Sequence, residues 1–158
     1  MTKYITSKSL ARQRRLIQQL ESKLQEKGKE LGEAGSQGAE SWHDNAPFEA
    51  ARDEVMLQDK ALSRAHEVIA GTQIRDYLRN VGDFVDYGVG VRFLRDGKLV
   101  DLKIVGYGDS DVEEGRVLYE SPIAKVLIGK KVGDEFEAEV AGRPAEIKVK
   151  EVYVISED

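Results

Sequence analysis

Two acidic residues, Glu40 and Asp44, stand four residues apart in a short polar segment that also holds Trp42, His43 and Asn45. Carboxylate oxygens suit Mg²⁺, which commonly takes one or two carboxylates together with the phosphates of a substrate. Two carboxylates cannot build such a site alone, so they would complete a metal site owned by a partner. The residues alone favour a plainer alternative, a solvated loop in which Asp44 or Asn45 caps the following helix.

The composition excludes several other kinds of chemistry. The chain has 158 residues, no Cys and two His, so it holds no disulfide, thiolate metal site or cysteine nucleophile. No apolar run approaches the roughly 20 residues of a membrane span, and the first residues lack the apolar core of a secretory signal. We therefore expect a soluble cytoplasmic protein that does not bind a membrane. The net charge of -5 argues against a protein that coats nucleic acid.

The residues on both sides of the acidic segment repeat every seven positions, as in a coiled coil. The repeating apolar residues are Leu10, Ile17, Leu24 and Leu31 before the segment, and Phe48, Val55, Leu62 and Ile69 after it. Glycines near residue 35 end the first helix, and Pro47 suits the first turn of the second. The sequence therefore predicts an antiparallel hairpin over residues 1–76. In such a hairpin the apolar rows of the two helices pack against each other within one chain and form a seam, so we expect a monomer.

From Val81 onward the apolar period changes to two, which indicates β-strands. Asp96-Gly97 is typical of a tight hairpin turn, and Ser121-Pro122 is typical of the start of a short helix. We expect a small antiparallel β domain with one short helix over residues 81–158. The predicted fold class is α+β, with the coiled-coil hairpin first and the β domain second.

Two stretches of the chain resemble the bacterial Gre transcription elongation factors (GreA and GreB). The segment Ser41-Trp42-His43-Asp44-Asn45-Ala46-Pro47-Phe48-Glu49-Ala50-Ala51 is similar to the motif at the tip of the family's hairpin. The segment Ser121-Pro122-Ile123-Ala124-Lys125-Val126-Leu127-Ile128-Gly129, followed by Gly133-Asp134, is similar to the signature of its C-terminal domain. The resemblance covers nearly the whole chain and implies an FKBP-like fold for the C-terminal domain.

The resemblance also implies a function. In the family the C-terminal domain docks on RNA polymerase, and the hairpin enters the secondary channel. There the acidic tip helps the polymerase's own active site to cleave backtracked RNA. This chain would then be an accessory factor and not an enzyme. Its partners would be bacterial RNA polymerase and, indirectly, the 3′ end of the nascent RNA. It would share Mg²⁺ with the polymerase active site and bind none alone.

The same resemblance suggests roles for individual residues. Asp44 and Glu40 are the candidate catalytic and metal-binding acids. Ser41, Trp42, Asn45 and Phe48 would support the tip. Ser121, Pro122 and Ile123 would contact the polymerase.

The tip departs from the family pattern in ways that leave three hypotheses open. Asp44 stands where the family has Glu, Ser41 where it has an essential Asp, and Glu40 where it has Gly. In the first hypothesis Glu40 substitutes for the missing acid and the protein promotes cleavage. In the second, it occupies the channel and modulates or inhibits the polymerase without efficient cleavage. The third hypothesis, peptidyl-prolyl isomerase activity of the C-terminal domain, ranks lowest. Isomerases that resemble this fold line a pocket with aromatic residues, whereas several of the few aromatic residues in 81–158 alternate as core.

Overall fold

The structure is a computed structural model of the chain, and it describes residues 2–37 and 46–156. The chain forms two compact units, one of residues Leu10–Ala70 and one of Met1–Ser9 with Gly71–Asp158. We call the first the hairpin and the second the body. Residues 1–9 and 71–76, which the predicted hairpin of residues 1–76 includes, thus group with the body.

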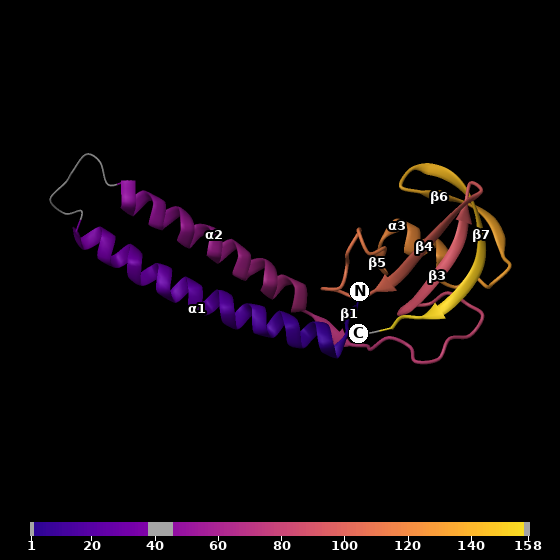
Figure 1. The fold of residues 1–158 in the computed structure, drawn as a ribbon, viewed down its shortest axis with the longest axis horizontal. Coiled ribbons are helices and arrows are strands. Elements are labelled where there is room, and N and C mark those ends of the chain that lie inside the picture. Colours follow the sequence, from indigo (N-terminus) through magenta and orange to yellow (C-terminus); the bar gives the residue numbers. More distant parts are fainter. Residues whose placement is uncertain (1, 38–45, 157–158) are drawn as a thin grey trace. The chain divides into compact units, whose positions relative to one another are not determined.

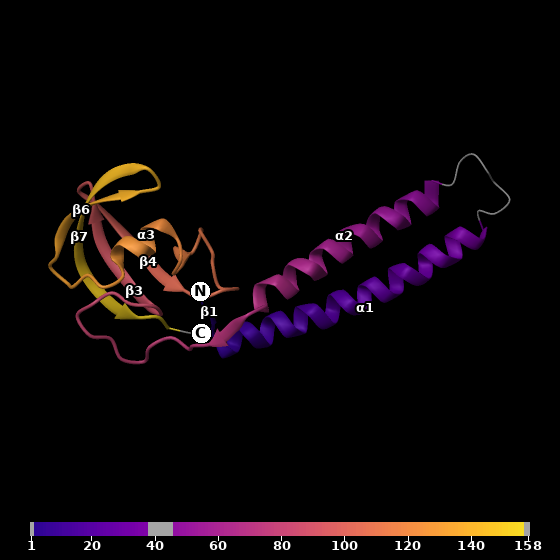
Figure 2. The same ribbon diagram turned by 180° about the vertical axis from the view of Figure 1, so that it is seen from behind.

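The hairpin is built from α1 (Ser7–Gln37), whose first three residues group with the body, and α2 (Ala46–Ile69). The two helices run antiparallel and side by side in both views of the ribbon (Figures 1 and 2). In each helix the less exposed residues recur at alternating spacings of three and four. These rows are Leu10, Gln13, Ile17, Leu20, Leu24, Lys27 and Leu31 in α1, and Phe48, Ala51, Val55, Gln58, Leu62, Ala65 and Ile69 in α2, with Ala61 and Val68 beside the row of α2. Ile17 and Ala65 are the most deeply buried of them, at 7% and 4% exposure. This pattern confirms the predicted coiled-coil hairpin.

Two short strands, β1 (Lys3–Ile5) and β2 (Thr72–Ile74), pair in parallel within the body. α1 begins directly after β1, and its first turn is capped twice. The Thr6 hydroxyl accepts a hydrogen bond from the Ser9 backbone N–H at 3.1 Å, and the Asp76 carboxylate accepts one from the Ser7 backbone N–H at 2.7 Å. These acceptors satisfy N–H groups that a helix start leaves without a partner.

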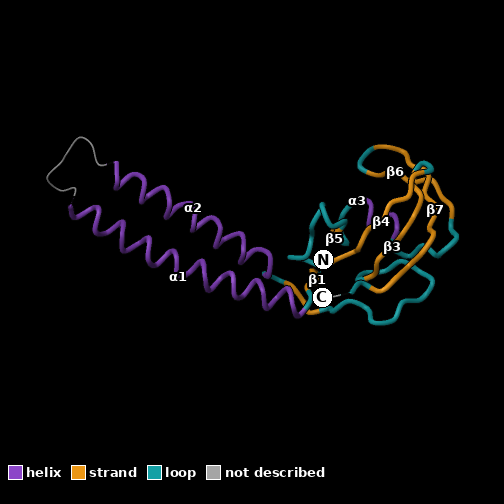
Figure 3. Tube along the Cα trace, viewed as in Figure 1, coloured by secondary structure: helices purple, strands orange, loops and turns teal. Residues whose placement is uncertain are grey.

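The body is built on a sheet of five strands in the order β5-β4-β3-β7-β6. The strands are β3 (Val89–Arg95), β4 (Lys98–Val105), β5 (Arg116–Leu118), β6 (Glu135–Val140) and β7 (Arg143–Val154), drawn in orange in Figure 3. The predicted turn at Asp96-Gly97 is confirmed, with positive φ angles of 50° and 81° that suit a two-residue hairpin. One pair differs from the predicted antiparallel sheet. β4 and β5 are parallel, because residues 106–115 carry the chain back beside Lys103, so that β5 pairs with the last three residues of β4.

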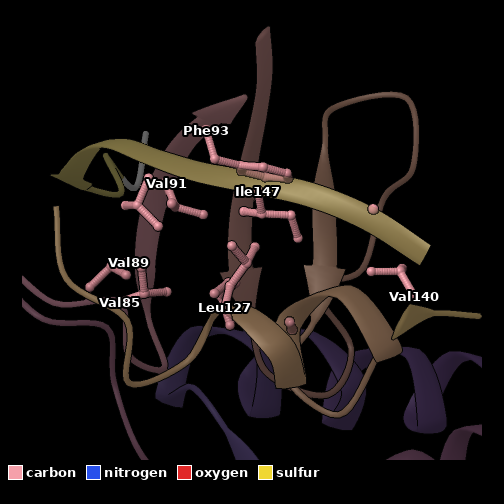
Figure 4. Close-up of a cluster of buried hydrophobic side chains, with 11 residues drawn as sticks. Val85, Val89, Val91, Phe93, Leu127, Val140 and Ile147 are labelled. Carbon is pink, nitrogen blue, oxygen red and sulfur yellow. The ribbon is translucent and has the colours of Figure 1, made fainter. Parts of the chain in front are cut away.

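One short helix, α3 (Pro122–Leu127), packs against the sheet and closes the core of the body. Figure 4 shows Leu127 of α3 in one cluster with Val89, Val91 and Phe93 of β3 and Ile147 of β7. Leu127 and Phe93 are both fully buried. Removing such side chains from water contributes about 1.5–3 kcal/mol each. The described fold is thus the α+β architecture expected from the sequence.

Candidate functional site

The acidic segment joins the adjacent ends of the two hairpin helices. α1 ends at Gln37 and α2 begins at Ala46. The predicted tip residues Glu40, Ser41, Trp42, Asp44 and Asn45 lie outside the described residues, so their roles stay a prediction. Among the residues that are described, no group of three or more His, Asp or Glu side chains could hold a metal ion.

Phe48 is the predicted tip residue that the structure does describe. It lies in the first turn of α2, is half-buried, and occupies the inward stripe of that helix. The heptad spacing places it level with Leu31 of α1. Packing in the seam accounts for an aromatic residue at this position.

Lys27 is a charged residue in the otherwise mostly apolar seam of the hairpin. Its Nζ lies 2.8 Å from a carboxylate oxygen of Glu54 in α2 and 3.2 Å from one of Glu30 in α1. Hydrogen bonds to Glu54 and then Glu30 raise the pKa of Lys27, so the amine stays charged. A polar group at one inward position of a coiled coil specifies register at a cost in stability. The ion pair therefore fixes which residues of α1 and α2 face one another below the tip.

In the body, Ser121, Pro122 and Ile123 begin α3. The Ser121 hydroxyl accepts a hydrogen bond from the Ala124 backbone N–H at 3.4 Å, and Pro122 occupies the first helical turn. Ile123 is half-buried against the core, whereas Pro122 is exposed. Of the three predicted contact residues, Ser121 and Ile123 thus have structural tasks, and Pro122 presents its ring to solvent.

The rest of the second motif is explained by the turn that follows α3. Gly129 and Gly133 have φ angles of 90° and 92°, a region that glycine adopts without strain. The Asp134 carboxylate accepts a hydrogen bond from the Lys131 backbone N–H at 2.8 Å. These residue types are needed to build the turn, so most of the motif is a signature of the fold.

A cluster of five tyrosines is the feature that sequence reasoning missed. The rings of Tyr4, Tyr87 and Tyr119 lie 5.3–5.7 Å apart, and Tyr77 and Tyr107 extend the group. The Arg75 guanidinium lies 4.7 Å from the Tyr87 ring and 5.0 Å from the Tyr4 ring. The five tyrosines are far apart in the sequence, so no local spacing predicts that they form a cluster.

Hydrogen bonds tie this tyrosine cluster to both chain segments that border the hairpin. The Asp109 carboxylate accepts hydrogen bonds from the Ser9 hydroxyl and the Tyr77 hydroxyl, and Ser9 is fully buried. Burial raises the pKa of Tyr77 well above its ordinary value. The Tyr107 hydroxyl donates to Glu120 at 2.5 Å, which raises the pKa of Tyr107 to about 12. Burial and hydrogen bonding thus favour the protonated hydroxyls of Tyr77 and Tyr107.

The body also has a hollow of about 420 Å³ beside β6 and β7, lined by Leu94, Gly97, Glu135, Phe136, Glu137, Glu146, Ile147 and Lys148. One aromatic ring and three carboxylates do not make the aromatic-lined pocket expected of a peptidyl-prolyl isomerase. No helix in the described part of the chain is long and apolar enough to cross a bilayer.

The chain is similar to known proteins along nearly its whole length. A family model described as "Transcription elongation factor, GreA/GreB, C-term" matches residues 80–154. The chain is 30% identical to transcription elongation factor GreA of Christiangramia forsetii over 95% of its own length and 96% of the relative's. It is 32% identical to GreA of Mesorhizobium japonicum over 79% of the chain and 80% of that protein. The crystal structure of GreA factor homolog 1 (Gfh1) from Thermus thermophilus covers 97% of the chain, with 19% identity and a TM-score of 0.45.

Fold and sequence thus define a protein with a helical hairpin and a β body, and the family model spans most of that body. The chain belongs to the GreA/GreB family of transcription elongation factors.

Proposed function

We propose that this protein binds bacterial RNA polymerase, inserts the connected end of its hairpin through the secondary channel, and promotes cleavage of backtracked RNA by the polymerase active site. The carrying observation is the similarity to GreA over nearly the full length of both chains. The hairpin supports it, because its two helices meet at a segment that carries Glu40 and Asp44. Such a factor assists an enzyme and is not one itself.

The proposed chemistry needs carboxylates at the connected end. Mg²⁺ shared with the polymerase would stabilise charge on the attacking and leaving oxygens of the RNA phosphate. Asp44, with Glu40 as the second acid, would supply oxygen ligands that complete the site, and Ser41, Trp42 and Asn45 would hold them in place. The isolated protein would bind no Mg²⁺. It would act as a cytoplasmic monomer, touching the 3′ end of the nascent RNA only indirectly.

Docking is assigned to the start of α3. Pro122 is exposed there, next to Ser121 and Ile123, whose own hydrogen bond and core packing hold the ring in a fixed position. A rigid apolar ring costs little conformational entropy on binding. We assign the polymerase contact to this residue first.

A second function is favoured by Ser41, a neutral residue where the Gre motif has Asp. With one carboxylate fewer at that position, the protein would occupy the channel and slow or modulate nucleotide addition without efficient cleavage. A misplacement of about 1 Å in a reacting group can cost on the order of 100-fold in rate.

RNA cleavage in stalled complexes of the matching polymerase separates the two functions. The variants are Asp44→Ala and Glu40→Ala, and Asp53→Ala, an exposed acid of α2, is the matched control. Transcript shortening that falls about 100-fold with Asp44→Ala, but not with Asp53→Ala, supports the cleavage function. Slower nucleotide addition without shortening supports the second function. No effect of the wild-type protein on the polymerase contradicts both.

A further inference from the structure

Two glycines, Gly28 and Gly32, lie inside α1 in its half nearer to α2's first residue. Both are exposed, and a Cβ atom built on either would meet nothing within 4 Å. Neither has a positive φ angle. Close packing and backbone geometry therefore give no reason for glycine at these two positions.

Other glycines of the chain show what a structural need looks like. A Cβ on Gly90 would lie 2.2 Å from the Tyr153 ring. One on Gly106 would lie 2.6 Å from the Tyr87 hydroxyl and 2.8 Å from the Tyr4 carbonyl oxygen. Those two sites exclude a side chain, whereas Gly28 and Gly32 do not.

What glycine does at positions 28 and 32 is weaken the helix. Glycine inside a helix is less favourable than alanine because its unfolded backbone has more freedom to lose. The seam gives this region little compensation, because Lys27 replaces an apolar residue there. By heptad spacing, Leu31 and Phe48 form an apolar layer beyond Lys27, separated by it from Leu24 and Val55.

We propose that residues 28–33 of α1, which are helical in the structure, form a weak segment that opens locally much more often than residues 14–24, and that docking of the hairpin keeps this segment closed. The opening is a property of the isolated protein. The role of the segment in docking rests on the proposed function. Closing an open segment on binding lowers the affinity, and a stiffer helix would avoid that loss. Elements that must adapt to a partner are commonly drawn from the least stable parts of a fold.

Amide hydrogen exchange of the full-length protein tests the opening. The double variant Gly28→Ala/Gly32→Ala should slow exchange at residues 28–33 by about fivefold per substitution, or roughly 25-fold together, and leave residues 14–24 unchanged. Gly82→Ala is the control, because it is an exposed glycine outside any helix with nothing within 4 Å of its Cβ. Unchanged exchange at 28–33 in the double variant would overturn the proposal.

The role of the segment in docking is tested by titrating the wild type and the double variant into stalled transcription complexes. The double variant should reach its half-maximal effect at a lower concentration than the wild type, because the wild type loses affinity in proportion to the fraction of molecules whose segment is open. A half-maximal concentration that stays equal or rises overturns the role of the segment in docking. If neither protein acts on the polymerase, the proposed function fails instead, and the exchange result still decides whether the weak segment exists.

Discussion

Lys27 of α1 and Glu54 of α2 form an ion pair of 2.8 Å across the seam of the hairpin. Lys27 has a second carboxylate, that of Glu30, at 3.2 Å. The pair holds the two helices at one register just below the segment that carries Glu40 and Asp44. Because the side chains are partly solvated, its value lies more in register than in stability.

Replacing Lys27 should therefore show that the ion pair contributes little to the stability of the hairpin. We expect Lys27→Leu to raise the thermal midpoint of the hairpin, since an apolar residue suits an inward heptad position. Glu54→Ala should lower it slightly, and Asp59→Ala, an exposed acid on the same helix, should not change it. Circular dichroism melts measure all three, and a lower midpoint for Lys27→Leu would contradict the interpretation.

Asp76 should make stability depend on pH in the acid range. Hydrogen bonds from the Ser7 backbone N–H and hydroxyl lower the pKa of Asp76 below its ordinary value of 3.8. A carboxyl group with a lowered folded-state pKa contributes stability above its unfolded pKa and loses it as the pH falls through the folded value. The urea midpoint of Asp76→Ala should thus lie below that of the wild type at pH 7.

The difference in urea midpoint between the wild type and Asp76→Ala should shrink as the pH falls below 3.8. Asp83→Ala, an exposed acid in the same part of the body, serves as the control. A difference that persists undiminished into strong acid would show that the Asp76 carboxylate does not act as a charged cap.

Gly106 should tolerate no side chain. A Cβ there would lie 2.8 Å from the backbone carbonyl oxygen of Tyr4, and backbone cannot move aside as a side chain can. We expect Gly106→Ala to destabilise the body by about 1–3 kcal/mol, the usual cost of overpacking a filled site. Urea unfolding measures the loss, and Gly82→Ala, which meets nothing, should stay within about 0.5 kcal/mol of the wild type.

Pro122 should matter for partner binding and not for folding. Pro122→Glu keeps a residue that suits the first turn of a helix, because an acidic side chain there complements the helix dipole. We expect its melting temperature to match the wild type while its affinity for RNA polymerase falls at least tenfold. Ile123→Ala, by contrast, should lower stability as well, since Ile123 packs on the core. Equal polymerase affinity of wild type and Pro122→Glu would move the docking surface elsewhere.

The parts of the fold that sequence alone predicts are those with a local pattern. The heptads of α1 and α2 and the turn at Asp96-Gly97 each follow from spacing within a few residues. The pairing of β1 with β2 was missed, because three-residue strands are too short to show a period. The parallel register of β4 and β5 was also missed, since it depends on the path of the chain between them.

The same distinction between local and long-range features applies to the residues discussed for the candidate site. The capping role of Ser121 and the packing of Phe48 agree with local patterns. The carboxylate of Asp109 between Ser9 and Tyr77 joins residues that are remote in sequence, and only the folded chain reveals it. The roles of Glu40 and Asp44 rest on the family resemblance and stay predictions.

The body is assembled from both ends of the chain, because Met1–Ser9 belongs with Gly71–Asp158. Along the chain, the hairpin thus lies between the two segments that make up the body. A nascent chain leaving the ribosome cannot complete that domain until β2 has been synthesised, long after β1. A shortened gene in which a flexible linker replaces Leu10–Ala70 should therefore still encode a folded body, ready to receive a different insert.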